Sequence, residues 1–390
     1  MAPQPTVLVL GGVGFIGRNF VAHLVENGLA ADIRVVDKAL PQTAYFNDRF
    51  KAAFEKVDFL QGDLSNTISP PTVALCLNVD VPPEKFEKMY TRADGSSFDY
   101  VINFASETRF SQPPELYEER VYKLSINCAK QAVKKGCKVF VQLSTADVYK
   151  SGDTPSKETS ETQPWNDLAK YKLKVDEELQ NMPGLNLVIL RPAVVYGIGA
   201  MTGLTPRLIC GRVYKHNKSK MEFLWTGDLK LNTVHVQDVV SAVWHSANWY
   251  VSSDNSQPGT PVTFNLADQN DTDQEAVNAH IRGIFGIETG FKGTIFSEAA
   301  MVAYGQKETA EETNDMHLGP WAEILKGQNI KTSPLTPYLD ADLLAKNSLS
   351  LDGNHISVST GFKYEHPKLT EQSLREIISD FQNLGIWPRD

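Results

Sequence analysis

After Thr6 the chain reads Val7-Leu8-Val9-Leu10-Gly11-Gly12-Val13-Gly14-Phe15-Ile16-Gly17. A short apolar run ends in a turn with glycines spaced G-x-x-G-x-x-G, and apolar residues then recur with helical spacing at positions 20, 21, 24 and 25. This pattern predicts a buried parallel strand, a tight turn and the N-terminus of a helix. Main-chain N–H groups and the helix dipole at such a turn can bind a phosphate directly. We expect the three spaced glycines to serve the turn, the close approach of a pyrophosphate and the packing of helix on strand.

Further apolar runs of strand length follow, separated mostly by segments with helical spacing. The predicted strands cover residues 33–37, 57–61, 100–105, 139–144, 187–191 and 262–266, and the predicted helices cover residues 114–135, 166–180 and 238–250. Strands that alternate with helices imply a parallel sheet covered on both faces. The predicted fold class is therefore α/β, a Rossmann-like doubly wound parallel sheet with a smaller, mixed C-terminal substrate lobe.

Asp37 ends the second predicted strand, 20 residues after Gly17. A carboxylate at this place can accept hydrogen bonds from both ribose hydroxyls of a dinucleotide and repel a 2′-phosphate. The neighbouring Lys38 could instead accept that phosphate. We expect NAD as the cofactor rather than NADP.

The alternation of strands and helices loosens beyond Gly197. We assign residues 1–197 to an NAD-binding Rossmann domain, to which residues 233–268 return. Residues 198–232 and 269–390 then form the smaller lobe, and a small-molecule substrate would bind between the lobes.

The composition is that of an ordinary globular protein. Of 390 residues, 42% are hydrophobic and 22% are charged, and the formal net charge is −9. This acidic balance argues against nucleic acid or an anionic membrane as a partner. No apolar run approaches the length of a membrane span, and Cys76, Cys128, Cys137 and Cys210 lack metal-ligand spacing. We expect a cytoplasmic protein without a metal site.

Motifs along residues 6–245 resemble, in order and spacing, those of the extended short-chain dehydrogenases/reductases, the NAD-dependent epimerase/dehydratase family. After the glycine turn and Asp37 they are Gly62-Asp63-Leu64, Asn103-Phe104-Ala105-Ser106, Asn127, Leu143-Ser144-Thr145-Ala146-Asp147-Val148-Tyr149, Leu190-Arg191-Pro192, Val195-Tyr196-Gly197 and Val234-His235-Val236-Gln237-Asp238. The resemblance also implies a homodimer built on residues 114–135 and 166–180.

The resemblance implies a role for residues along the whole length of the cofactor. Those that would bind it are Gly11, Gly14, Phe15 and Ile16 at the pyrophosphate, Asp37 at the adenosine ribose, Asp63 and Leu64 beside the adenine, and Ala105, Ser106, Lys172 and Pro192 towards the nicotinamide half. Asn127 would support the backbone of its helix, and Arg191, His235 and Asp238 are expected to be structural.

The family removes the hydroxyl proton of its substrate with a tyrosine, assisted by a lysine four residues later and by a Ser or Thr after the fifth strand. Thr145 and Lys172 match two of these positions. The position four residues before Lys172 is Leu168, which carries no ionisable group. The sequence therefore departs from the family pattern at its central catalytic residue.

Three interpretations of this departure remain open. Tyr171 could replace the missing tyrosine, with Lys172 or Lys174 assisting it. An acid such as Asp147 or Glu107 could transfer the proton instead. Alternatively, the chain could bind NAD without turnover and serve a regulatory or protein-interaction role. We expect an enzyme, an oxidoreductase or epimerase, with Thr145, Asp147, Tyr171 and Lys172 as its catalytic residues.

Two further departures bear on the substrate. Asp147 resembles one of two adjacent acids in sugar-nucleotide dehydratases, but the other position holds Ala146, so a complete dehydratase mechanism is not expected. Leu231 stands where members that act on nucleotide sugars carry an arginine that clamps the diphosphate, and Lys230 is one place away. Because losing such a clamp is costly, we expect a small alcohol or ketone, or a sugar-derived molecule of lower charge.

Overall fold

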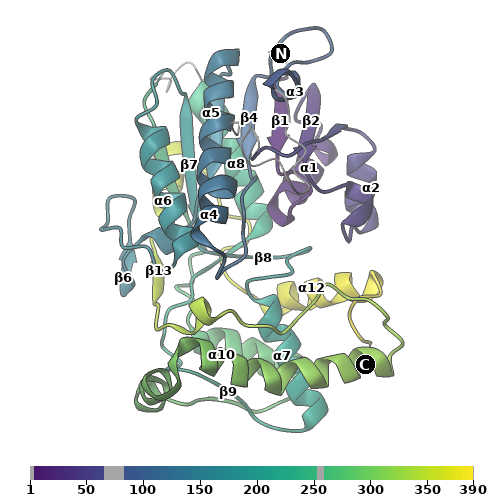
Figure 1. Ribbon diagram of the computed structural model, residues 1–390, viewed down its shortest axis with the longest axis vertical. Coiled ribbons are helices and arrows are strands. Elements are labelled where there is room, and N and C mark those ends of the chain that lie inside the picture. Colours follow the sequence, from purple (N-terminus) through teal and green to yellow (C-terminus); the bar gives the residue numbers. More distant parts are fainter. Residues whose placement is uncertain (1–3, 66–82, 253–258, 390) are drawn as a thin grey trace.

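The computed structural model describes residues 4–65, 83–252 and 259–389. At its centre lies a seven-stranded sheet in the order β11-β7-β5-β4-β1-β2-β3, in which every neighbouring pair is parallel (Figure 1). The strands are β1 (Thr6–Leu10), β2 (Asp32–Asp37), β3 (Asp58–Gln61), β4 (Tyr100–Asn103), β5 (Val139–Leu143), β7 (Leu187–Pro192) and β11 (Val262–Leu266). This sheet confirms the predicted α/β, Rossmann-like fold class.

Helices cover both faces of the sheet. Successive strand residues point to opposite sides, so the apolar strands expose side chains on both faces that must be buried. Val7 and Val9 pack in one hydrophobic core with α1 (Phe15–Glu26), α2 (Asp48–Phe54) and α8 (Val236–Val251). Leu8 and Leu10 pack in a second core with α3 (Pro83–Met89), α5 (Leu124–Lys135) and α6 (Asp167–Gln180). Burial on both faces explains why these strands read as continuous apolar runs.

Some predicted elements differ in detail. β4 ends at Asn103 rather than at residue 105, because Asn103 Oδ1 accepts a hydrogen bond from the main-chain N–H of Ala105 (3.1 Å) and turns the chain. The helix predicted over residues 114–135 begins as α4 (Pro114–Tyr117), passes through a π-helical turn, η2 (Glu118–Lys123), and continues as α5. Part of the connection expected over residues 65–99, including Cys76, lies outside the described residues.

A smaller lobe gathers beyond one end of the sheet (Figure 1). Its helices are α7 (Thr205–Asn217), α9 (Gln274–Phe285), α10 (Thr294–Gly327) and α12 (Glu371–Asn383), and α7, α9 and α12 share one hydrophobic core. α10 is broken at Gly305, where φ is 77°. The side chain of Asn47, at the start of α2, donates a hydrogen bond to Asp380 of α12 (2.7 Å) and so joins this lobe to the sheet domain.

Short parallel pairs connect segments that are distant in sequence. They are β8 (Val194–Tyr196) with β10 (Thr233–His235), β9 (Met221–Phe223) with β12 (Thr289–Phe291), and β6 (Gly152–Ser156) with β13 (Leu349–Leu351). The remaining short helices are η1 (Pro41–Thr43), η3 (Ala146–Val148), η4 (Ala341–Leu344) and α11 (Asn354–Thr360). Although α11 falls in the range that we assign to the smaller lobe, its Ile356 packs in the core of the sheet domain.

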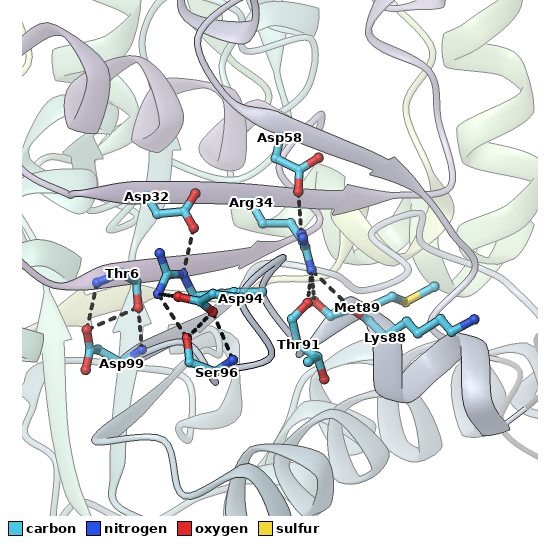
Figure 2. Close-up of polar contacts among 11 residues, drawn as sticks. Thr6, Asp32, Arg34, Asp58, Lys88, Met89, Thr91, Asp94, Ser96 and Asp99 are labelled. Atoms are coloured by element: carbon cyan, nitrogen blue, oxygen red, sulfur yellow. Dashed lines mark hydrogen bonds and ion pairs between the residues drawn. The ribbon is translucent and has the colours of Figure 1, made fainter.

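A polar network holds together the amino-terminal edge of the sheet (Figure 2). Arg34 of β2 donates hydrogen bonds to Asp58 (2.7 Å) and to the carbonyls of Lys88 (3.1 Å) and Thr91 (2.6 Å). Asp99, just before β4, accepts hydrogen bonds from the main chain and hydroxyl of Thr6. The network therefore fixes the end of α3 against β2 and β3, at the edge opposite the glycine turn.

Within the described ranges, no helix is long and apolar enough to cross a membrane. In the same part of the chain, no group of His, Cys, Asp and Glu side chains is placed to hold a metal ion.

Candidate functional site

The glycine turn between β1 and α1 has the geometry of an anion cradle. α1 begins after Gly14 with no side-chain cap and no acidic residue in its first turn. Gly11 has a φ of 75°, and a Cβ there would lie 2.5 Å from the main-chain nitrogen of Ala105, while a Cβ at Gly17 would lie 2.3 Å from the carbonyl oxygen of Gly11. The packing of the protein therefore excludes a side chain at Gly11 and at Gly17, whether or not a ligand is bound.

Gly14 is less tightly enclosed. Apart from its chain neighbours, a Cβ at Gly14 would meet one atom within 4 Å, the carbonyl oxygen of Gly11 at 3.3 Å. The N–H groups of Phe15 and Ile16 follow directly in the first turn of α1, where the helix itself offers them no carbonyl acceptor. The turn therefore fits the pyrophosphate of a dinucleotide, which needs close approach to the backbone and free N–H donors.

Asp37 lies beside this turn at the carboxyl end of β2. Its two carboxylate oxygens accept hydrogen bonds from the main-chain N–H groups of Val13 (2.9 Å) and Ala39 (2.9 Å). Burial raises the pKa of Asp37 above its ordinary value. The carboxylate is thus held where the ribose next to the pyrophosphate would lie.

Arg18 supports the same turn, and sequence reasoning missed it. Its Nε donates hydrogen bonds to the carbonyls of Val13 (3.1 Å) and Gly14 (3.2 Å), and its guanidinium lies 5.0 Å from the ring centre of Phe46. The available signal was an arginine placed directly after the last glycine of the turn. Arg18 therefore gives the carbonyls of Val13 and Gly14 a hydrogen-bond donor within the protein and so stabilises the turn.

The other predicted cofactor contacts line the carboxyl ends of the strands. Asp63 accepts hydrogen bonds from the N–H (3.0 Å) and hydroxyl (2.6 Å) of Ser65, and Leu64 is buried. Ala105 lies against Gly11, and the Ser106 hydroxyl donates to the carbonyl of Glu107 (2.9 Å). Pro192 is the last residue of β7. The carboxyl ends of β1, β2, β4 and β7 therefore bring most of the predicted cofactor residues to one edge of the sheet.

Glu107 is fixed in an ion pair. Its carboxylate accepts hydrogen bonds from Arg109 Nε (3.0 Å) and from the main-chain N–H groups of Thr108 (3.0 Å) and Arg109 (3.1 Å). Burial alone would raise its pKa, but these hydrogen bonds lower the pKa of Glu107 to about 2. Glu107 is therefore ionised at neutral pH and poorly suited to exchange a proton there.

A lysine and an aspartate lie near enough to interact electrostatically at the carboxyl end of β5. Lys172 Nζ donates a hydrogen bond to the carbonyl of Leu143 (3.2 Å), and Thr145 Oγ1 accepts one from the N–H of Asp147 (3.3 Å). Burial raises the pKa of Asp147 to about 6, against the attraction of Lys172. Burial also lowers the pKa of Lys172 to about 8, against Asp176 and Asp147. The pKa values of an acid and a base thus converge on neutrality, as proton transfer at pH 7 requires.

Tyr171 lies on a neighbouring face of α6. Its ring centre is 5.9 Å from that of Tyr117 and 5.9 Å from Lys174 Nζ. Leu168, one turn before Lys172, is 8% exposed and packs in the same core as α5. The structure therefore brings together Thr145, Asp147 and Lys172, and it directs Tyr171 towards Tyr117.

The residues expected to be structural have partners within the protein. Arg191 Nε donates to Asp176 (2.9 Å), which also accepts from the Ser144 hydroxyl (2.8 Å). Asp238 accepts hydrogen bonds from the main-chain N–H groups of Glu365 and His366, and the His235 ring lies 3.8 Å from that of His366. Arg191, His235 and Asp238 thus each contact other parts of the protein, and their structural role stays a prediction.

Lys230 does not take over from the arginine missing at position 231. Its Nζ pairs with Asp271 (2.7 Å) and donates to the Asp271 carbonyl (3.4 Å). Leu231 itself packs against the core of the smaller lobe. Lys230 is therefore already paired and is not a free cation for a substrate phosphate.

The family model described as NAD dependent epimerase/dehydratase family matches residues 7–267. The chain belongs to this family, as its motifs predict. The family uses NAD, which confirms the predicted cofactor.

Similar curated proteins are plant enzymes. UDP-glucose 4-epimerase 3 of Oryza sativa subsp. japonica is 27% identical over 199 residues, 48% of each chain. UDP-glucose 4-epimerase 2 of Arabidopsis thaliana is 30% identical over 176 residues, 44% of this chain and 45% of its own. The chain thus matches about half the length of these relatives.

Solved structures resemble nearly the whole chain. MoeE5 in complex with UDP-glucose and NAD has a TM-score of 0.64 at 16% identity and covers 97% of this chain and 99% of its own. UDP-glucose 4-epimerase of Thermotoga maritima, with UDP-glucose, has a TM-score of 0.65 at 17% identity, with the same coverage. At such identities the likeness establishes the fold.

Proposed function

We propose that this chain is an NAD-dependent oxidoreductase or epimerase that acts on a hydroxyl or carbonyl group of a sugar-derived molecule or another small alcohol or ketone. The observation that carries the proposal is the pair of Asp147 and Lys172 at the carboxyl end of β5, on the same edge of the sheet as the glycine turn. The names of its relatives, UDP-glucose 4-epimerases, support the sugar-derived class. The family gives no support to an inactive NAD-binding protein.

NAD, when bound, takes the hydride from the substrate or returns it. The protein supplies the proton transfer, and the ionised carboxylate of Asp147 would accept the proton of the substrate hydroxyl. The Lys172 ammonium stabilises negative charge near Asp147 and would bind the ribose beside the nicotinamide. Thr145 Oγ1 accepts the main-chain N–H of Asp147. The Thr145 hydroxyl also hydrogen-bonds the Asp147 carboxylate and opposes the burial that raises its pKa, so Thr145 would hold this carboxylate in place.

Tyr171 is the competing candidate for the proton transfer, and a pair of variants separates the two. A panel of UDP-sugars, free sugars, alcohols and ketones is first screened by nicotinamide absorbance and by chromatography of epimers. With the substrate found, Asp147→Asn should lower kcat by about 100- to 10,000-fold, and Tyr171→Phe should leave it within a few-fold. The opposite ranking would assign the proton to Tyr171.

A cytoplasmic location and a homodimer remain predictions.

A further inference from the structure

Two buried amides, Asn103 and Gln142, lie opposite each other at the carboxyl ends of β4 and β5. They are direct partners in the parallel register, and the two residues are 1% and 3% exposed. Asn103 Nδ2 donates a hydrogen bond to Gln142 Oε1 (2.8 Å) and a longer one to Ser125 Oγ of α5 (3.4 Å). Phe140, two residues before Gln142 and so on the same face of β5, packs in the apolar core with α5 and α6. Two amides in such a core are costly unless hydrogen bonds compensate for their burial.

A chain of hydrogen bonds fixes the orientation of this amide pair, Asn103 and Gln142. Gln142 Nε2 donates to the main-chain carbonyl of Leu143 (3.3 Å), so Gln142 Oε1 is turned towards Asn103. Asn103 Nδ2 then faces Gln142, and Asn103 Oδ1 accepts the main-chain N–H of Ala105 (3.1 Å). Turning either amide round would set donor against donor or acceptor against acceptor. The amide pair is therefore held in one arrangement.

Both ends of the chain of hydrogen bonds reach residues predicted to bind NAD. At one end, Ala105 lies against the glycine turn, where a Cβ at Gly11 would be 2.5 Å from the main-chain nitrogen of Ala105. At the other end, the Leu143 carbonyl is the group to which Lys172 Nζ donates (3.2 Å). A carbonyl oxygen has two lone pairs, and because Gln142 uses one of them, Lys172 is restricted to the other. The amide pair thus connects the Ala105 turn to Lys172.

We propose that Gln142 is a positioning residue, which holds the Ala105 turn and Lys172 in one fixed arrangement for NAD. Gln142 acts through Asn103 on the turn and through the Leu143 carbonyl on Lys172. With its approach restricted, the Lys172 ammonium loses less conformational freedom when it meets the ribose beside the nicotinamide. This proposal rests on the proposed function, because it concerns the same NAD site, but its test measures NAD affinity and needs no turnover.

Calorimetric titration of NAD into the full chain tests the proposal. Gln142→Met keeps the size of the side chain and removes both of its hydrogen bonds, so NAD should bind about three- to tenfold more weakly. Asn314→Leu is the matched control. Asn314 is an amide of the smaller lobe that is 4% exposed and exchanges hydrogen bonds with the main chain of Leu339. Asn314→Leu should lose stability as well, and it should bind NAD as the unchanged chain does.

A double variant separates positioning from folding. Gln142→Met takes the closer acceptor from the buried Asn103 amide, so its melting temperature should fall. Adding Asn103→Leu leaves neither amide in the core and should recover part of that loss. NAD affinity should nevertheless stay low in the double variant. Recovery of NAD affinity together with stability would show a merely structural role and overturn the proposal.

Lys172→Met tests the connection to the lysine. It removes the ammonium from the Leu143 carbonyl, so Gln142→Met should weaken NAD binding less in this background than in the unchanged chain. An equal loss in both backgrounds would overturn the proposal, as would equal NAD affinity of Gln142→Met and the unchanged chain. Turnover is measured separately. If NAD binds and no compound of the substrate panel reacts, the proposed function fails, while the NAD affinities still decide the role of Gln142.

Discussion

Lys172 Nζ donates a hydrogen bond to the main-chain carbonyl of Leu143 at 3.2 Å, and this contact anchors α6 to the carboxyl end of β5. The contact keeps the amine among Thr145, Asp147 and Asp176 instead of in solvent. A lysine can therefore hold its place in the site although Leu168, one turn earlier, carries no phenol.

Turnover should follow a bell-shaped dependence on pH. Asp147 must be ionised to accept a proton and has a pKa of about 6, whereas Lys172 must be protonated and has a pKa of about 8. kcat/KM should rise with pH through the first value and fall through the second. Measuring kcat/KM of the unchanged enzyme and of Asp147→Asn checks this, since the variant should lose the acidic limb. A variant that keeps the acidic limb would contradict the assignment.

Asp147→Asn should stabilise the fold while it lowers activity. The pKa of Asp147 is raised from 3.8 to about 6 in the folded state, so folding favours its protonated form. Its contribution to stability is present below the unfolded pKa and is lost as pH rises through about 6. At pH 7 the amide should therefore add about 2–3 kcal/mol to the free energy of unfolding, and at pH 4 much less. Urea unfolding at both pH values measures this, with the exposed Asp48→Asn as the control.

Gly14→Ala and Gly17→Ala should separate cofactor binding from folding. A methyl group at Gly14 meets one carbonyl oxygen at 3.3 Å and projects into the cradle, so the protein should fold and bind NAD at least about tenfold more weakly. At Gly17 the methyl would lie 2.3 Å from a main-chain oxygen, so the melting temperature should fall. Calorimetric titration of NAD and thermal melts measure the two effects. Equal NAD affinity in Gly14→Ala and the unchanged chain would mean that the pyrophosphate lies elsewhere.

Local patterns in the sequence were enough to predict the sheet and the cofactor turn. The apolar runs that contain Val7 and Val9 are continuous because the strands are covered on both faces, and no long-range contact is needed to recognise them. The glycines are likewise recognisable because their role is set by backbone sterics within a few residues. The same reasoning gave Asp37, which ends a strand next to that turn.

Side-chain pairings could not be predicted in the same way. Lys230 pairs with Asp271, 41 residues away, and Arg207 approaches Gln274, 67 residues away. Such contacts form only when the smaller lobe folds back on itself, and no short-range sequence pattern predicts which residues then meet. Burial raises the pKa of both Asp147 and Glu107, but the pKa of Glu107 falls overall because only Glu107 gains an arginine and several N–H donors.

Arg34→Met should destabilise the protein without changing its chemistry. Removing the guanidinium takes a donor from Asp58 and from the carbonyls of Lys88 and Thr91, and of these the Lys88 carbonyl keeps the main-chain N–H of Thr91 (Figure 2). Asp58 is half exposed, so most of the cost comes from the carbonyls, and we expect a loss of about 2–4 kcal/mol in the free energy of unfolding. Urea unfolding measures the loss. Lys51→Ala is the control, because it removes a cation whose ion pair, with Asp48, is exposed to solvent. A kcat reduced at temperatures where the variant is folded would show that the network also acts on the site.

Leu168→Tyr should partly restore an enzyme that lacks Asp147. Residues 168 and 172 lie one turn apart on the same face of α6, so a phenol at position 168 would approach the Lys172 ammonium, which lowers the pKa of a neighbouring phenol. In the Asp147→Asn background, Leu168→Tyr should raise kcat at least about tenfold. Leu168 is buried, so the larger ring should cost about 1–3 kcal/mol of stability.

Leu168→Phe in the same background is the matched control, because it adds the ring without the hydroxyl. Recovery by the tyrosine alone would show that position 168 still faces the reacting carbon, whereas equal recovery by both variants, or by neither, would mean that the proton leaves by another route.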